Sequence, residues 1–242
     1  MSPFIAALPM YDWPELRAET DAQWVAIRDR LRAAEIDAPE QLTRQNTHAG
    51  GLDLDALWRH PRLLLAQTCW GPLETGLSAH VQVVGQPDYS DCEGGQGELY
   101  SSALVMRGPG PAVEAPATGD AVLPLDLLRG GRLAFNGADS MSGMLALGRD
   151  LEALGEGLAI FSERIETGGH RASLGVVAAG EAEVAAIDCR SWSLFKRLEP
   201  NVAARLHVVG WTARRKGLPF ITARTTPPQT VAALREALAT VS

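Results

Sequence analysis

Short apolar runs alternate along the chain with segments whose apolar residues recur every three or four positions. Apolar runs of about four to eight residues are typical of buried strands, and the wider spacing is typical of helices that bury one face. Strands are predicted at residues 4–8, 38–43, 62–67, 78–85, 99–107, 133–135, 159–162, 182–187, 206–211 and 219–223. Helices are predicted at residues 15–34, 53–58, 123–128, 144–154, 174–179, 192–198 and 230–241. This alternation predicts an α/β protein with largely parallel sheets.

The stretch from Asn136 to Met144 follows one predicted strand and opens the next predicted helix. The first turn of a helix has backbone N–H groups without intrahelical acceptors, and its dipole is positive there, so it attracts anions. Ser140 and Ser142 add hydroxyl donors, and Gly143 lets a ligand approach the backbone closely. Asp and Ser are also common N-caps, however. The stretch by itself therefore leaves an anion site and an ordinary helix cap both open.

Polar side chains also follow other predicted strands, where α/β sheets bind their ligands. They are Tyr11, Thr68, His170 and Asp188. Three of them have a purely structural alternative. Tyr11 could cover the core with its ring, His170 could be a surface residue of a loop, and Asp188 could be the N-cap of the following helix.

Length, charge and apolar content exclude some classes of protein. A chain of 242 residues with 46% hydrophobic content can form one large domain or two small ones. The net charge of −7 argues against a general nucleic-acid binder. No stretch approaches 18 apolar residues, so no membrane span is predicted. The start shows no basic and apolar leader, so we expect a soluble, cytoplasmic protein if the sequence is complete as given, and a periplasmic one if a leader has been removed.

The cysteines and the motifs give no support for catalysis. Cys69, Cys92 and Cys189 are too few and too widely spaced for a disulfide framework or a zinc motif, which leaves open one disulfide or three reduced thiols. A cysteine nucleophile with His170 as base is the enzyme alternative, but no nucleophile signature surrounds Cys69 or Cys189. Ser140 does not lie in a Gly-x-Ser-x-Gly turn, and no phosphate-binding glycine loop occurs. We therefore expect no catalytic residues, no metal and no cofactor.

Six short segments, taken in order, carry a resemblance to a known family. They are Ala7–Asp12, Leu65–Cys69, Phe135–Gly143, Gly168–Ser173, Ala185–Asp188 and Gly217–Phe220. From residue 4 to about residue 225, the chain resembles the substrate-binding proteins of phosphate, phosphite and phosphonate ABC transporters. The resemblance implies the type II periplasmic-binding-protein fold, in which two crossover strands join two α/β lobes around a ligand cleft. Residues 1–87 with 211–242 would form the first lobe, and residues 88–210 the second.

The resemblance also implies a function and a site. The protein would capture a small oxyanion, with a phosphonate or phosphate-like compound as first candidate, for uptake through an ABC permease. Asp188 would accept a proton from the ligand or pair with an amino group on it. A cytoplasmic ligand sensor or accessory protein of the same fold, and a small enzyme that uses the cleft, are the alternatives. The implied ligand contacts are Tyr11, Thr68, Ser140, Met141, Ser142, Gly143, His170 and Asp188.

Overall fold

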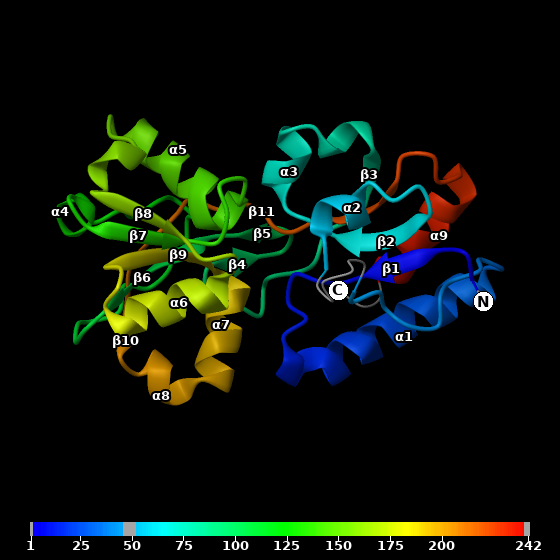
Figure 1. Cartoon of the computed structure of the whole chain (residues 1–242), viewed down its shortest axis with the longest axis horizontal. Coiled ribbons are helices and arrows are strands. Elements are labelled where there is room, and N and C mark those ends of the chain that lie inside the picture. Colours follow the sequence, from blue (N-terminus) through cyan, green and yellow to red (C-terminus); the bar gives the residue numbers. More distant parts are fainter. Residues whose placement is uncertain (1, 46–51, 240–242) are drawn as a thin grey trace. The chain divides into compact units, whose positions relative to one another are not determined.

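The computed structural model describes residues 2–45 and 52–239 (Figure 1). Contacts divide the chain into two compact units. Unit 1 comprises Met1–Pro87 and Leu218–Ser242, and unit 2 comprises Asp88–Gly217. The resemblance assigned residues 211–217 to the first lobe, but in the structure they belong to unit 2. The reason is strand pairing, because Trp211 completes strand β10 of unit 2 and Arg215–Lys216 (β11) pair with Leu99–Tyr100 (β5).

Unit 1 is built on a four-stranded sheet. Its strands, in spatial order, are β1 (Ile5–Ala7), β2 (Leu63–Gln67), β12 (Phe220–Ala223) and β3 (Val81–Gly85). Its helices are η1 (Pro14–Leu16), α1 (Arg17–Ala33), α2 (Leu54–Trp58), α3 (Trp70–Glu74), η2 (Leu77–Ala79) and α9 (Pro228–Leu238). Successive residues of a strand face opposite sides, so Leu64 packs with α1 and α9 while Leu63 packs with α2 and α3. Both faces of the sheet are thus covered, which explains why all of β2 is buried.

Unit 2 contains a five-stranded sheet and a small three-stranded one. The larger sheet has the order β10 (Leu206–Trp211), β6 (Ser102–Arg107), β9 (Val184–Asp188), β7 (Arg132–Phe135) and β8 (Glu163–Glu166). The smaller sheet has the order β11, β5 and β4 (Gly95–Gln96). The helices are α4 (Leu125–Leu128), the π-helical turn η3 (Met141–Leu145), α5 (Ala146–Ala153), η4 (Leu158–Ile160), α6 (His170–Ala179), α7 (Cys189–Leu198) and α8 (Pro200–Ala203). Strands β9, β7 and β8 run parallel side by side (Figure 1).

The sheets are mixed, and the prediction of largely parallel sheets was wrong. Strand β12 runs antiparallel to β2 and β3, and β6 runs antiparallel to β9 and β10. Hydrophobic periodicity does not report the direction in which a buried strand runs, so the sequence pattern could not show this.

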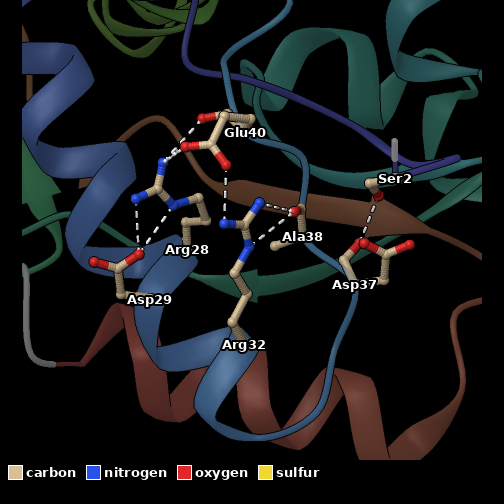
Figure 2. Close-up of polar contacts among 7 residues, drawn as sticks. All are labelled: Ser2, Arg28, Asp29, Arg32, Asp37, Ala38 and Glu40. Carbon is tan, nitrogen blue, oxygen red and sulfur yellow. Dashed lines mark hydrogen bonds and ion pairs between the residues drawn. The ribbon is translucent and has the colours of Figure 1, made fainter.

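The strand predicted at residues 38–43 is absent. Thr43 donates one backbone hydrogen bond to Ala6, but no ladder follows. Side chains of α1 hold this segment instead, as Figure 2 shows. Arg28 and Arg32 both bind the carboxylate of Glu40, at 2.6 and 2.9 Å, and Arg32 also donates to the carbonyl of Ala38. The buried Ala38 and Leu42 had produced a strand-like pattern in an irregular segment.

The strand predicted at residues 159–162 is also wrong. That segment overlaps η4, and the strand lies just after it, at β8. Among the described residues, strand β8 pairs with β7 alone and lies at the edge of the sheet, so three of its four residues are exposed and its sequence has no apolar run.

Several other boundaries differ from those predicted. The segment predicted as one strand at 99–107 forms β5 and β6 in two different sheets, and the short helix α3 was not predicted. The final helix begins at Pro228, before the predicted residue 230, and its predicted last residues, 240 and 241, lie outside the described residues. The remaining predicted strands and helices are present, with their ends displaced by a few residues.

Candidate functional site

The turn after β7 leads into one continuous helical segment formed by η3 and α5. Ser140 is its N-cap, and the hydroxyl oxygen of Ser140 accepts a hydrogen bond from the Gly143 N–H at 3.1 Å. The carbonyl of Ser140 accepts from both Met144 and Leu145, which produces the wider π-helical turn. The cap interpretation of this stretch is therefore confirmed, and the hydroxyl proton of Ser140 is left to donate elsewhere.

Gly143 lies directly against the side chain of Asn136. A Cβ atom at this position would lie 1.8 Å from Oδ1 of Asn136, which is buried and has no hydrogen-bond partner among the described residues. Asn136 thus packs its side chain directly against the first turn of the helix. It opens the stretch that the sequence singled out, but the reasoning from sequence did not select it as a site residue.

Three polar side chains from different elements meet beside this turn. The hydroxyl oxygen of Ser142 lies 2.9 Å from Nε2 of His170, and the same nitrogen lies 3.2 Å from Oδ2 of Asp188. All three are largely withdrawn from solvent, with Ser142 3% exposed, Asp188 1% exposed and the His170 side chain 11% exposed. We call Ser142, His170 and Asp188 the polar cluster.

Sheet topology explains why these residues meet. Ser142 follows β7, His170 follows β8 and Asp188 ends β9, and these three strands are parallel neighbours whose carboxyl ends lie at one edge. Thr167 links the loop after β8 to the end of β7, because its hydroxyl and its N–H both donate to the carbonyl of Phe135.

His170 begins helix α6, and its side chain is only 11% exposed, so the alternative of a surface loop residue is wrong. Burial lowers the pKa of His170 below its ordinary value, and the nearby carboxylate of Asp188 opposes that shift. A lowered pKa favours the neutral ring, in which only one nitrogen carries a proton. That proton belongs on Nε2, because a lone pair on Nε2 would face the negative oxygen of Asp188. His170 thus donates towards Asp188 and Ser142, and the Ser142 hydroxyl remains able to donate its own proton outward.

The polar cluster contains the residue types of a serine-hydrolase triad but not its geometry. In such a triad the serine and the aspartate contact opposite nitrogens of the histidine. Here both contact Nε2, while Nδ1 is buried with no partner among the described residues. A proton taken from Ser142 would therefore have no separate nitrogen to occupy, and the arrangement suits the orientation of a hydroxyl donor rather than the generation of a nucleophile.

Asp188 has a structural task as well. Its Oδ1 accepts from the Ser191 N–H at 2.9 Å and caps helix α7. The N-cap alternative is therefore confirmed, and it does not exclude the contact with His170, because a carboxylate has two oxygens.

The predicted site residues divide between the two units. Met141 is buried in η3, and its sulfur lies 3.7 Å from Nη1 of Arg149. Tyr11 and Thr68 belong to unit 1. Tyr11 is half-buried in the loop after β1. Thr68 follows β2, is fully buried, and has a hydroxyl with no partner among the described residues. The structure thus brings together the six predicted residues of unit 2, and the ligand-binding roles of all eight residues stay predictions.

Comparison with known proteins agrees with this topology. Residues 79–242 match the model of the family described as ABC transporter, phosphonate, periplasmic substrate-binding protein. The chain belongs to this family. Its members are solute-binding proteins of transporters and not enzymes. No curated protein sequence matches the chain significantly.

Solved structures show the same type II periplasmic-binding-protein fold. A binding-protein component of an ABC phosphonate transporter from Pseudomonas aeruginosa is 14% identical, with a TM-score of 0.67 over 98% of this chain and 74% of its own. PhnD1 from Prochlorococcus marinus, in complex with methylphosphonate, is 15% identical, with a TM-score of 0.65 over 98% of this chain and 82% of its own. A Xanthomonas citri protein bound to ATP is 16% identical, with a TM-score of 0.64 and coverage of 98% and 82%.

Within residues 2–45 and 52–239, no helix has both the length and the apolar character needed to cross a membrane. Over the same residues, no group of three or more His, Cys, Asp or Glu side chains is arranged to hold a metal ion.

Proposed function

We propose that this protein binds a small phosphonate or phosphate-like oxyanion and presents it to an ABC permease. The observation that carries the proposal is the polar cluster, in which His170 orients the hydroxyl of Ser142 at the start of a helix. Family membership supports a transported small ligand but leaves its identity open.

The chemistry of the cluster suits an oxyanion. A phosphonate offers three acceptor oxygens, so its site needs several donors. Ser140 and Ser142 each supply a hydroxyl proton, and the first turn of the η3–α5 segment supplies backbone N–H groups and a positive dipole. Because Ser140 and Ser142 are buried, each of these hydrogen bonds is stronger than it would be in water.

Asp188 contributes to oxyanion binding indirectly, by orienting His170, and does not itself donate a hydrogen bond to the ligand. A carboxylate next to an oxyanion repels it, but this one is occupied by the Ser191 N–H and by the ring of His170. Its charge fixes the proton of His170 on Nε2 and so determines which way Ser142 can donate. The same charge disfavours a fully ionised ligand, and it favours a mono-protonated one or one that carries an amino group.

Isothermal titration calorimetry tests the proposal on the full chain. The ligands are phosphate, phosphite, methylphosphonate and 2-aminoethylphosphonate, with ATP as a bulky phosphate compound for contrast. We expect saturable heat from at least one phosphonate and weaker binding of ATP. Absence of binding to all four small oxyanions would refute the proposed function.

Alanine variants locate the site. Ser142→Ala or His170→Ala should weaken binding by about 1–3 kcal/mol, since a charged acceptor loses one donor or its orientation. Matched controls are Ser162→Ala and His80→Ala, whose side chains are exposed. Equal affinity in the Ser142, His170 and control variants would place the ligand elsewhere. Alanine variants of Tyr11 and Thr68 belong in the same series.

A further inference from the structure

Two of the three cysteines are neighbours in unit 2, although they lie far apart in the sequence. Cys92 and Cys189 are both buried, and their thiols lie within hydrogen-bonding reach of each other. Neither side chain is part of the polar cluster. Cys69, the third cysteine, belongs to unit 1.

Backbone hydrogen bonds hold the two cysteines in place. Cys92 lies in a tight turn, in which its N–H donates to Tyr89 and its carbonyl accepts from Gly95. Ser101 contacts both sides, because its N–H donates to Gly94 of this turn and its carbonyl accepts from the N–H of Cys189. These bonds show that the folded backbone of unit 2 brings the segments of Cys92 and Cys189 together.

Arg190 provides a positive charge beside the pair. Its guanidinium donates to the carbonyl of Asp88, lies 2.8 Å from the Asp91 carboxylate, and stacks over the Tyr89 ring at 4.7 Å from the ring centroid. The hydrogen bond from Cys189 lowers the pKa of Cys92, and Arg190 lowers it further, while burial acts against both. Donating this hydrogen bond raises the pKa of Cys189, and burial and the nearby Asp188 carboxylate raise it further. Of the two thiols, Cys92 therefore loses its proton more readily, and the thiolate is the reactive form of a thiol.

We propose that Cys92 and Cys189 form a disulfide bond by exchange with a disulfide-bearing oxidant, and that Cys69 stays reduced. The Cys92 thiolate attacks one sulfur of the oxidant and displaces its other sulfur as a thiolate. Cys189 then loses its proton and attacks the Cys92 sulfur of the mixed disulfide, which releases the second thiolate. The two cysteines lose two electrons and the oxidant disulfide gains them. The periplasm, where members of this family act, is an oxidising compartment in which such bonds persist.

The bond would be a covalent cross-link between the turn that contains Cys92 and the start of helix α7. It would close a loop of about 100 residues, and long loops give the largest entropic stabilisation. It would also fix the first residue of α7, directly after Asp188 of the polar cluster. The inference does not depend on the identity of the ligand.

The test uses the full chain, first reduced and then incubated with oxidised glutathione. After denaturation and alkylation with N-ethylmaleimide, the intact mass should show one adduct, against three in a fully reduced sample, since the chain has three cysteines. Proteolytic mapping should find the peptide of Cys92 linked to that of Cys189. Three adducts, a link that includes Cys69, or only mixed disulfides with glutathione would overturn the proposal.

Variants sharpen the result. Cys69→Ser should keep the cross-link and lose its one adduct, whereas Cys92→Ser and Cys189→Ser should each lose the cross-link. Reduction of the Cys69→Ser variant should lower its Tm by roughly 5–15 °C, the shift expected when so long a closed loop is opened. The mapping of the unmodified chain decides the question even if a serine variant fails to fold.

Discussion

Replacing Asp188 with asparagine should move the proton of His170 from Nε2 to Nδ1. In the native protein Oδ1 of Asp188 accepts from Ser191, and Oδ2 faces Nε2 of His170 at 3.2 Å. An asparagine can keep the capping bond with its oxygen, because Asn caps helices as well as Asp does. Its amide nitrogen would then face His170 and donate. Two donors cannot bond to each other, so Nε2 must become an acceptor.

The consequence for binding follows from Ser142. With a lone pair on Nε2, the Ser142 hydroxyl at 2.9 Å is drawn to donate to His170 and no longer towards the ligand. Loss of one hydrogen bond to a charged acceptor costs about 1–3 kcal/mol. This corresponds to an increase in Kd of roughly 5- to 150-fold. An analogous exchange of carboxylate for amide imposes the wrong histidine tautomer in serine proteases.

Two measurements check this reasoning separately. Nitrogen-15 NMR of the imidazole reports which nitrogen of His170 carries the proton, and it needs no ligand. Calorimetry with the tightest-binding phosphonate reports the change in Kd. The control is Asp188→Ala, which also removes the cap of α7 and should lower the free energy of unfolding by about 1 kcal/mol more than Asp188→Asn does. A proton that stays on Nε2 in Asp188→Asn would refute the tautomer argument.

Two further predictions concern stability. Gly143→Ala would place a Cβ atom 1.8 Å from Asn136 Oδ1, so the Asn136 side chain must shift, and we expect a loss of about 1–3 kcal/mol in urea unfolding. Gly175→Ala is the matched control, because nothing lies near its Cβ position within α6, and equal losses in both variants would contradict the packing argument. Burial lowers the pKa of His170, so between that lowered value and the ordinary value of about 6.5 the unfolded chain binds more protons than the folded one. Stability should therefore fall as the pH is lowered through this window, and His170→Gln should lose less free energy of unfolding between pH 7 and pH 5 than the native chain; an equal loss would count against a buried neutral His170.

Much of the fold could be predicted from apolar patterning. Buried strands such as β2 and β9 have continuous apolar sequences, because both faces of their sheets are covered. The failures have physical causes. The edge strand β8 has no apolar run, and the irregular segment at residues 38–43 has buried residues without a strand, since Arg28 and Arg32 hold it by hydrogen bonds. Neither kind of contact leaves a periodic signal in the sequence.

The candidate site divides in the same way. A serine-rich helix start after a strand was visible in the sequence, because capping is a local interaction over three or four residues. The sequence also placed His170 and Asp188 after strands, which made both candidates but left each with an ordinary explanation.

The sequence alone indicated the helix caps at Ser140 and Asp188, most of the buried strands and the polar groups that follow them, since these depend on neighbours along the chain. The tertiary structure alone showed that Ser142 and Asp188 both contact Nε2 of His170, because the parallel order β9, β7, β8 brings the three strand ends together. It alone also placed Cys92 against Cys189, through the backbone bonds of Ser101. Contacts between segments this far apart depend on sheet order and strand direction, which a one-dimensional pattern does not encode.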